Sequence, residues 1–374
     1  MQVIEINVAG ICDKFYDVFF EKLNSNKNFE LIEYIPCTKK EYSLRRQKKH
    51  KVIYVPIKTS LDRIFLDRKT SKYKKYLENY CDMSKINLIH AHSLFSDGMV
   101  ALKLHNLYSI PYIVAFRATD EEIFLKYFLM ARKYMKDIVS NAEKVIFINP
   151  SCYERMLNKY TDIFNCKKVD VIPNGVDDYW LENKNNEIKH ITKKEINILQ
   201  VSRLVKVKNI DKSINAVKDL IDNGYKVHFN VVGKGREKEN LLKLVAKKNL
   251  EEKVTFYDYI DSKEKMLNIY RENDIFLLPS KNETFGISYI EALSQGLPII
   301  GMNNGGVSGF FKNNSAFSGL NSSKPKEIAE NIKQMINNYD NYSKYCLESI
   351  DQFNWNFIIK QYKDLYMKIC DRRK

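Results

Sequence analysis

Two carboxylates with seven residues between them, Glu283 and Glu291, are the residues of this chain best placed for chemistry. Gly286 permits a tight turn after the first of them, and the following residues favour a helix until Gly296 and Pro298 end it. Free N–H groups at the start of such a helix attract an anion, above all a phosphate. We therefore expect one carboxylate at the helix start and the other about two turns deeper. The alternative is a pair of ordinary acids, one in a loop and one on a solvated helix face.

Two cations, Arg203 and Lys208, lie in a loop that follows a strand-like run over residues 196–201. Because the loop leads into a helix, both side chains can reach a common point. A guanidinium together with an ammonium suits a departing diphosphate, since they neutralise the charge that accumulates on the phosphates. The alternative is two ordinary loop cations among the sixty-one lysines and arginines of the chain.

Two glycines, Gly233 and Gly235, stand at the end of a second strand-like run and before a helix. Lys238 occupies the place of the third glycine of a dinucleotide fingerprint, and no Gly-Lys-Ser or Gly-Lys-Thr of a Walker loop follows. A glycine pair of this kind is weak evidence for a nucleotide site when it stands alone.

Together with the segment Val-Ile-Pro-Asn-Gly-Val-Asp at residues 171–177, these features resemble the retaining family 4 glycosyltransferases of the GT-B type. The signature of that family is a pair of glutamates at this spacing, followed by Ala and a Gly-x-Pro exit. The resemblance covers nearly the full chain and is specific over residues 196–306. It implies transfer of a sugar, of the hexosyltransferase type, from a nucleotide diphosphate sugar to a hydroxyl acceptor with retention of configuration. It implies no cofactor, because the nucleotide sugar is a substrate.

The resemblance also implies a role for each motif residue. Glu291 is expected to bind the ribose hydroxyls, and Glu283 to hold the transferred sugar. Arg203 and Lys208 are expected to stabilise the leaving group, which makes them catalytic residues together with Glu283. The remaining donor-binding residues implied by the family motifs are Phe285, Gly286, Ile287, Gly233, Gly235, Ser202 and Asn174.

The first half of the chain carries candidate residues for the acceptor. His92 ends a strand-like run in a His-Ala-His segment, and the family has a His-x-His at this place, so His92 is a candidate catalytic residue. A histidine that hydrogen-bonds to nearby structure is the alternative. Arg117 replaces a histidine of the family pattern and is expected to hold a phosphate or an acidic sugar, while Asp120 is expected to orient the acceptor.

The pattern of elements predicts two doubly wound α/β domains. A chain of 374 residues with 44% hydrophobic residues can bury two cores, and both halves alternate short apolar runs with amphipathic ones, which favours parallel sheets. We expect a first domain over residues 1–180, a linker over 181–195 and a nucleotide-sugar domain over 196–352. Such domains face one another across a cleft at the carboxyl ends of their strands. In the resembling family, a terminal helix such as 353–374 crosses back onto the first domain.

Composition narrows the setting of the protein. The apolar runs are of strand length, well short of the roughly 20 residues that span a bilayer, and no signal peptide is visible at the start. Seven scattered cysteines indicate reduced thiols. We therefore expect a cytoplasmic protein. No Asp-x-Asp triplet occurs, so we expect no metal, with Arg203, Lys208 and the helix start taking its place.

A formal net charge of +15 favours binding to an acidic partner. Between residues 41 and 80, twelve Lys or Arg stand against four Asp or Glu, with tyrosines interleaved. Such a mixture suits an anionic membrane surface and a lipid-linked glycan acceptor, as in capsule or other surface-polysaccharide assembly. The expected positive face consists of Arg45, Arg46, Lys48, Lys49, Lys51, Arg68, Lys69, Lys72, Lys74 and Lys75. The alternative is a general bias of the chain towards lysine.

Rival functions remain open from the residues. A GT-B epimerase or phosphorylase would share the fold, although no pyridoxal-binding lysine is identified for a phosphorylase. A basic nucleic-acid-binding protein is supported by charge alone, and no recognisable nucleic-acid module occurs. We therefore expect no nucleic-acid partner.

Overall fold

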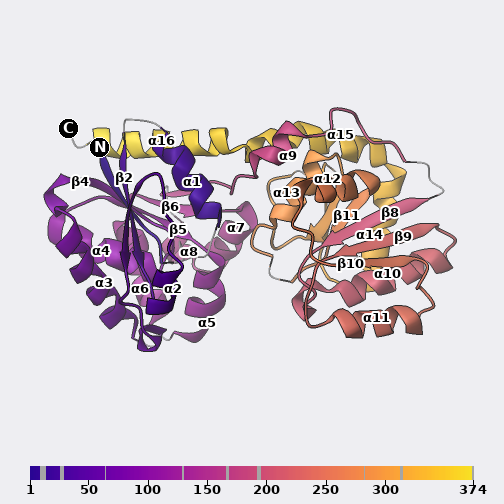
Figure 1. Cartoon of the computed structure of the whole chain (residues 1–374), viewed down its shortest axis with the longest axis horizontal. Coiled ribbons are helices and arrows are strands. Elements are labelled where there is room, and N and C mark those ends of the chain that lie inside the picture. Colours follow the sequence, from indigo (N-terminus) through magenta and orange to yellow (C-terminus); the bar gives the residue numbers. More distant parts are fainter. Residues whose placement is uncertain are drawn as a thin grey trace. The chain divides into compact units, whose positions relative to one another are not determined.

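The computed structural model describes residues 1–8, 14–25, 29–63, 65–128, 130–165, 168–191, 195–281, 283–311 and 315–372. Contacts divide the chain into two compact units (Figure 1). Unit 1 comprises Met1–Ile148, Tyr153–Pro173 and Trp355–Lys374, and unit 2 comprises Asn149–Cys152 and Asn174–Asn354. The stretch expected as a linker, 181–195, is grouped with unit 2, where the Asn185 N–H donates to the Ser294 carbonyl. Residues 192–194 of that stretch lie outside the described residues.

Unit 1 is built on a seven-stranded parallel sheet with the order β3-β2-β1-β4-β5-β6-β7. Its central strands are buried along almost their whole length, as expected for parallel strands covered on both faces, although β1 and β4 carry the polar Glu5 and His90 among their apolar residues. Every residue of β5, for example, is buried. The strands are β1 (Gln2–Ile6), β2 (Glu30–Pro36), β3 (Lys51–Val55), β4 (Ile86–Ala91), β5 (Tyr112–Phe116), β6 (Lys144–Phe147) and β7 (Val169–Val171).

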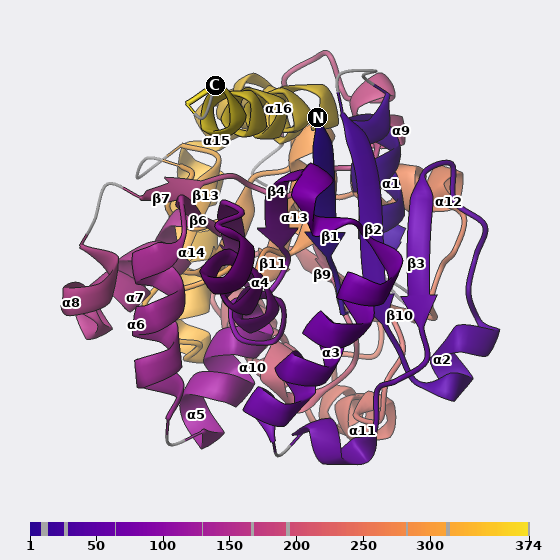
Figure 2. The same ribbon diagram turned by 90° about the vertical axis from the view of Figure 1, so that its left-hand side faces the viewer.

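Helices connect these strands and cover the sheet. The longer ones are α1 (Lys14–Asn24), α3 (Leu66–Tyr80), α4 (Ser96–Tyr108), α6 (Ala131–Asn141), α7 (Pro150–Lys159) and α16 (Trp355–Asp371). The short ones are α2 (Lys39–Ser43), η1 (Ser60–Arg63), η2 (Met83–Lys85), η3 (Asp120–Phe124), α5 (Leu125–Tyr127) and α8 (Thr161–Phe164). Figure 2 shows α2, α5 and the start of α3 at the end of this unit that is opposite to the N-terminus.

The terminal helix α16 lies in the core of unit 1, beside α1 (Figure 1). Its apolar stripe, at helical spacing, packs against α1 and the sheet, and Trp355 and Tyr362 contact Phe19 of α1. Helix α16 therefore completes a core that begins at the first strand, β1.

Unit 2 is built on a six-stranded parallel sheet with the order β10-β9-β8-β11-β12-β13. Its strands are β8 (Ile196–Val201), β9 (Val227–Val232), β10 (Val254–Tyr257), β11 (Ile275–Leu278), β12 (Ile299–Met302) and β13 (Phe317–Leu320). Its helices are α9 (Asp178–Glu182), η4 (Lys206–Lys208), α10 (Ile210–Asp222), α11 (Lys238–Lys247), α12 (Lys263–Glu272), α13 (Ile287–Ser294), α14 (Pro325–Asn337), α15 (Tyr339–Ser349) and η5 (Ile350–Phe353).

The core of unit 2 follows from helical periodicity. Ile210, Ile214, Val217 and Leu220 recur three or four residues apart on α10 and are all buried against the sheet. The fold class expected from the sequence, two α/β domains with parallel sheets, is confirmed. Strand β13 could not be recognised from the sequence, because a four-residue strand that contains Ser318 and Gly319 gives no clear strand pattern. None of the described helices combines the length and apolar character that a bilayer crossing requires.

A hydrogen-bonded tyrosine holds α16 against the sheet, and its removal should destabilise unit 1. The Tyr366 hydroxyl donates to Glu5 Oε1 at 2.9 Å and lies 2.6 Å from His90 Nδ1, and all three side chains are buried. Tyr366→Phe leaves two buried polar groups with one partner fewer, so the free energy of unfolding should fall by about 1–3 kcal/mol in urea titrations. On the same helix, Phe357→Ala removes a side chain that is 53% exposed and should change it by less than about 0.5 kcal/mol. Equal losses in the two variants would contradict this role of the hydroxyl.

Candidate active site

The structure brings two of the predicted catalytic residues of unit 2 together. Lys208 Nζ lies 2.5 Å from Glu283 Oε2, and each side chain is 15% exposed. Lys208 follows β8 and Glu283 follows β11, and these strands are neighbours in the sheet. Since the carboxyl ends of neighbouring parallel strands lie at the same edge, residues 75 positions apart in sequence meet there.

The backbone of Glu283 is held by a glycine loop that follows β12. The Gly306 N–H donates to the Glu283 carbonyl at 2.6 Å, and a Cβ placed on Gly305 would lie 2.6 Å from the same oxygen. Gly306 itself has a φ of +60°, which favours glycine. The two glycines therefore permit the loop to close against Glu283 at a distance that side chains would prevent.

The first turn of α13 adds a site for an anion. Gly286 is the N-terminal cap with a φ of +74°. The amides of Ile287 and Ser288, the first residues of the helix, have no carbonyl one turn earlier within it, while the Tyr289 N–H donates to the Gly286 carbonyl at 2.9 Å. The Tyr289 hydroxyl donates to the Leu278 carbonyl and so anchors this turn to β11. Phe285 is buried against Phe310 and Phe353, so of this residue only the backbone can face a ligand. The side chain of Ile287, by contrast, is largely exposed.

Glu291 occupies a separate, less exposed part of unit 2. Its Oε2 accepts from the Tyr270 hydroxyl at 2.7 Å, and Trp180 provides a second hydrogen bond. Burial raises the pKa of Glu291, an effect that these hydrogen bonds oppose. The sequence analysis did not identify Tyr270 and Trp180 as partners, since they lie on α12 and α9, and no spacing relates them to Glu291. Tyr270 and Trp180 thus orient the Glu291 carboxylate. The role of Glu291 in binding ribose remains a prediction.

The loops after β8 and β9 interlock through glycines. A Cβ on Gly233, whose φ is +144°, would lie 2.0 Å from the Ser202 carbonyl oxygen, and one on Gly235 would lie 2.3 Å from that of Leu204. The Leu204 N–H donates to the Lys234 carbonyl across the same contact. The glycine pair thus brings two loops of the protein together, which accounts for both glycines without a nucleotide.

Three further donor-side residues differ in exposure. Arg203 is exposed in the β8 loop. The Ser202 hydroxyl is buried and has no hydrogen-bond partner within the described part of the chain. Asn174 is half-buried at the start of unit 2. Two residues later, the Val176 N–H donates to the Phe353 carbonyl, and Val176 forms a β-bridge with Asn354, where the chain leaves that unit. Their contacts with a donor remain predictions.

In unit 1, His92 belongs to the core rather than to an open site. Its Nε2 lies 2.8 Å from Glu5 Oε2, and its ring packs edge-on against Tyr16, Phe19 and Phe20. Burial, with the charge of His90, lowers the pKa of His92 to about 3, so the ring is neutral at ordinary pH. These contacts agree with the alternative stated above, in which His92 is a structural histidine that hydrogen-bonds to its neighbours. They give no support to a catalytic role.

His90, His92 and Glu5 are also a candidate metal cluster, since one ligand atom of each lies within 4.8 Å of the others. The three atoms, however, are 2.8–3.0 Å from one another where contacts are measured, which is the spacing of hydrogen bonds. Bonds of about 2.0–2.1 Å to a zinc ion would separate tetrahedral ligands by about 3.3 Å. Among the residues that the structure describes, the outer nitrogens, His90 Nε2 and His92 Nδ1, also have no second partner of the kind that orients a metal ligand. The cluster is better explained as a hydrogen-bond network.

The other two unit 1 residues lie together on the loop after β5. Asp120 is fully buried, and its oxygens accept the N–H groups of Leu94, Phe95 and Arg117 at 2.9–3.1 Å. Burial raises the pKa of Asp120 to about 6 despite these bonds. Arg117 Nε donates to the His92 carbonyl at 3.3 Å. Asp120 therefore positions the loops that carry Arg117, and the acceptor role of either residue remains a prediction.

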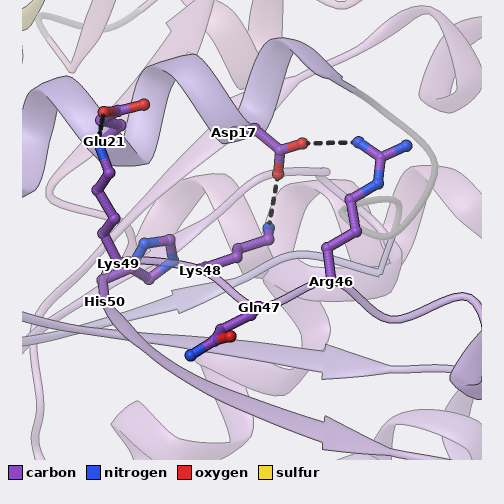
Figure 3. A pocket seen from close by; sticks show the side chains of 7 residues that line it. All are labelled: Asp17, Glu21, Arg46, Gln47, Lys48, Lys49 and His50. Atoms are coloured by element: carbon purple, nitrogen blue, oxygen red, sulfur yellow. Dashed lines mark hydrogen bonds and ion pairs between the residues drawn. The ribbon is translucent and has the colours of Figure 1, made fainter.

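Of the ten cations expected to form a single positive face, five pair with acids and a sixth, Lys69, is buried. Three of the paired cations, Arg46, Lys48 and Lys49, line a pocket with a volume of about 200 Å³. In it, Arg46 and Lys48 pair with Asp17, and Lys49 pairs with Glu21 (Figure 3). Lys48 also bonds the buried Glu33. Beyond this pocket, Lys72 pairs with Asp62, Lys74 pairs with Glu78, and Lys69 is buried. Acids of α1, β2, η1 and α3 thus pair with five of these cations, which a count along the sequence does not reveal.

Comparison with known protein families identifies both units of the chain. A family model described as Glycosyltransferase Family 4 matches residues 29–179, and one described as Glycosyl transferases group 1 matches residues 182–349. Two parallel-sheet units and these matches define a glycosyltransferase. The chain belongs to family 4 of the GT-B glycosyltransferases, as the resemblance in the sequence indicated.

Individual proteins give the same result. MJ1178 of Methanocaldococcus jannaschii, described as an uncharacterized glycosyltransferase, is 25% identical over 302 residues, 79% of each chain. WclY of Escherichia coli, an O-antigen biosynthesis glycosyltransferase, is 35% identical over 150 residues, 39% of this chain and only 40% of WclY. The crystal structure of HepE of Anabaena in complex with UDP has a TM-score of 0.72 at 15% identity, covering 98% of this chain and 100% of that one. At such low identity the last likeness shows the fold.

Gly233 should tolerate no side chain. Gly233→Ala combines a left-handed backbone with a contact of 2.0 Å to backbone, so we expect a loss of more than about 2 kcal/mol in the free energy of unfolding and weaker nucleotide binding. Gly224→Ala is a matched control, because Gly224 also has a positive φ, +85°, but a Cβ there would meet nothing within 4 Å. Urea unfolding of both variants measures the difference, and equal losses would show that backbone strain alone is responsible.

Acid should destabilise unit 1 through His92. In the unfolded chain His92 has a pKa near 6.5, whereas in the folded protein it stays unprotonated down to about pH 3. Because the unfolded state binds the extra proton between these values, the free energy of unfolding should rise with pH across this window, by up to about 1.4 kcal/mol per pH unit. The charge and hydrogen bonds of His90 and His92 overcome the effect of burial and lower the pKa of Glu5 to about 2, which adds a loss below pH 4.5. His92→Gln should flatten the dependence of the unfolding free energy on pH between 4 and 6.5. An unchanged slope would contradict the assignment.

Proposed function

We propose that this glycosyltransferase retains anomeric configuration and transfers a sugar from a nucleoside diphosphate sugar to a hydroxyl group of a lipid-linked glycan. The observation that carries the donor half of the proposal is the meeting of Lys208, Glu283 and the first turn of α13 at one edge of unit 2. An ammonium, a carboxylate and the first amides of a helix match a sugar bound to a diphosphate, since the phosphates need donors and the sugar hydroxyls need an acceptor. The UDP bound in the similarly folded HepE supports this class of donor.

The ion pair decides which group supplies net positive charge. Glu283 neutralises Lys208, so attraction of the diphosphate rests on the exposed Arg203 and on the dipole of α13. Lys208 still has N–H groups to donate, and its pairing with Glu283 fixes where they point. When the bond to the sugar breaks, charge grows on the leaving phosphate, and donors held in advance stabilise it without rearrangement. In this mechanism no metal ion and no cofactor is required.

The acceptor half of the proposal rests on unit 1. The loops that follow β2, β3 and β5, at the carboxyl edge of its sheet, expose six large apolar side chains: Leu44, Leu61, Phe65, Ile123, Tyr127 and Met130. Figure 2 shows the elements that carry them, α2, α5 and the start of α3, at one end of the unit. Apolar side chains on loops suit the lipid part of an acceptor or the surface of a membrane.

The proposal of a lipid-linked acceptor now rests on these exposed apolar side chains and no longer on positive charge. Of the ten cations expected to form a positive face, six are paired or buried. WclY, which this chain matches over 150 residues, is an O-antigen biosynthesis glycosyltransferase. That match supports a role in surface-polysaccharide synthesis, which we assign to the cytoplasmic face of a membrane.

Loss of both donor-site cations should abolish transfer. In Arg203→Ala/Lys208→Ala we expect kcat/KM to fall at least about 100-fold, since removal of even one such donor typically costs this much. The measurement is sugar transfer with the UDP-, GDP- or ADP-sugar that most raises the melting temperature of the parent protein. Lys206→Ala removes an exposed lysine from the same short helix and should leave transfer unchanged. Unaltered turnover in the double variant would reject the proposal, and sugar-nucleotide turnover that needs no acceptor would indicate an epimerase.

A further inference from the structure

One buried side chain connects the parts of the candidate active site in unit 2. Tyr289 lies in the first turn of α13, and its hydroxyl donates to the Leu278 carbonyl at 2.7 Å. Leu278 is the last residue of β11, and its partner in the neighbouring strand β12 is Gly301. Tyr289 therefore ties the start of α13 to the carboxyl ends of two adjacent strands, the edge at which an open α/β sheet binds ligands.

Three glycines lie against the Tyr289 side chain, one from each of three backbone segments. A Cβ on Gly286, the cap of α13, would lie 2.5 Å from Cδ2 of the ring. A Cβ on Gly301, in β12, would lie 2.5 Å from the hydroxyl oxygen, and one on Gly306, in the loop after β12, would lie 2.8 Å from Cε2. Because carbon atoms in contact are normally about 3.5–4.0 Å apart, the three segments approach the ring as closely as backbone without side chains permits.

The same contacts extend to Glu283. The Cβ positions of Gly286 and Gly306 are also 3.2 Å and 3.5 Å from Glu283 Cγ. The Gly306 N–H donates to the Glu283 carbonyl, and the Glu283 carboxylate pairs with Lys208. Burial, together with the charge of Glu283, raises the pKa of Tyr289, so its hydroxyl stays protonated and remains a donor. The position of the ring thus determines where the Glu283 loop and the loop after β12 can lie.

A second buried tyrosine of unit 2 has the same hydrogen bond but different surroundings. Tyr339, at the start of α15, donates its hydroxyl to the Asp274 carbonyl at 2.7 Å, just before β11. It packs in the apolar core of the unit. None of the described glycines has Tyr339 among the nearest neighbours of its Cβ position. The two tyrosines therefore bond to carbonyls at opposite ends of one strand, and of the two it is Tyr289 that contacts the loops of the site.

We propose that Tyr289 is a positioning residue of the donor site, whose ring fixes Glu283, the first amides of α13 and the glycine loop after β12. The inference rests on the proposed function, because that function assigns these groups to a nucleotide sugar. Tyr289 itself need not touch the donor. Groups that are held in place before the donor arrives lose less freedom on binding and stabilise the leaving phosphate without rearrangement.

The first experiment compares two leucine variants. Tyr289→Leu and Tyr339→Leu each remove a buried ring and one hydrogen bond to an end of β11, so both should lower the melting temperature. The donor is the UDP-, GDP- or ADP-sugar that most raises the melting temperature of the parent protein. Where both variants are folded, Tyr289→Leu should raise the dissociation constant of this donor and lower kcat, each at least about 10-fold, since small displacements of site groups are costly. Tyr339→Leu should keep the parent values.

The second experiment tests the contact from the side of the strand. In Gly301→Ala the new methyl group would lie 2.5 Å from the Tyr289 hydroxyl oxygen, so it should displace the ring and weaken donor binding. Tyr289→Phe removes that oxygen and keeps the ring, so by itself it should bind the donor as the parent does. In the double variant it should restore much of the affinity that Gly301→Ala loses. Effects that simply add would contradict a contact between the methyl group and the ring.

Hydrogen exchange in the ligand-free protein gives a measurement that needs no donor. Peptides that cover residues 283–291 and 303–308 should exchange faster in Tyr289→Leu than in Tyr339→Leu, because the Gly306 N–H loses its fixed partner, the Glu283 carbonyl. Equal exchange and equal donor affinity in the two leucine variants would overturn the positioning role. If Tyr289→Leu does not fold, the Gly301→Ala and Tyr289→Phe variants decide. If the parent protein binds none of the nucleotide sugars, the proposed function fails, and hydrogen exchange still shows whether Tyr289 holds the loops.

Discussion

Close approach of backbone to backbone is the constraint on which the donor half of this protein depends. The loops after β8 and β9 touch through Gly233 and Gly235, and the loop after β12 closes on Glu283 through Gly305 and Gly306. At these contacts a Cβ would come within 2.0–2.8 Å of neighbouring atoms. The glycines therefore shape the site chiefly by bringing protein loops together, and the charged residues can meet only because those loops do.

The two units use buried polar groups in different ways. In unit 1, Glu5 and His92 bond to one another and Tyr366 joins them from the terminal helix, so this network holds distant parts of the chain in one core. In unit 2, Glu291 is oriented by Tyr270 and Trp180 and remains at the edge of its core. A buried carboxylate is thus a structural element in one unit and a candidate ligand-binding group in the other, and its partners make the difference.

Net charge is a poor guide to the surface of this protein. The formal charge of +15 belongs to the whole chain, yet the segment richest in cations is largely paired, with Asp17 serving two of them. Exposed ion pairs of this kind contribute little to stability, but they remove cations from any long-range field. The apolar side chains on the loops of the same unit remain exposed, so the lipid hypothesis now depends on them.

The sequence by itself determined the α/β class, the alternation of strands and helices in both halves and the family, because apolar periodicity and the Gly and Pro residues that end elements are local signals and the glutamate motif is short. It missed β13, whose Ser and Gly carry no strand signal. Only the tertiary structure decided that His92 faces the core and that Lys208 meets Glu283. It also paired Arg46 and Lys48 with Asp17. The physical reason is that the environment of a side chain depends on which distant segment packs over it, and residues such as Tyr366, 361 positions from Glu5, become neighbours only when the chain folds.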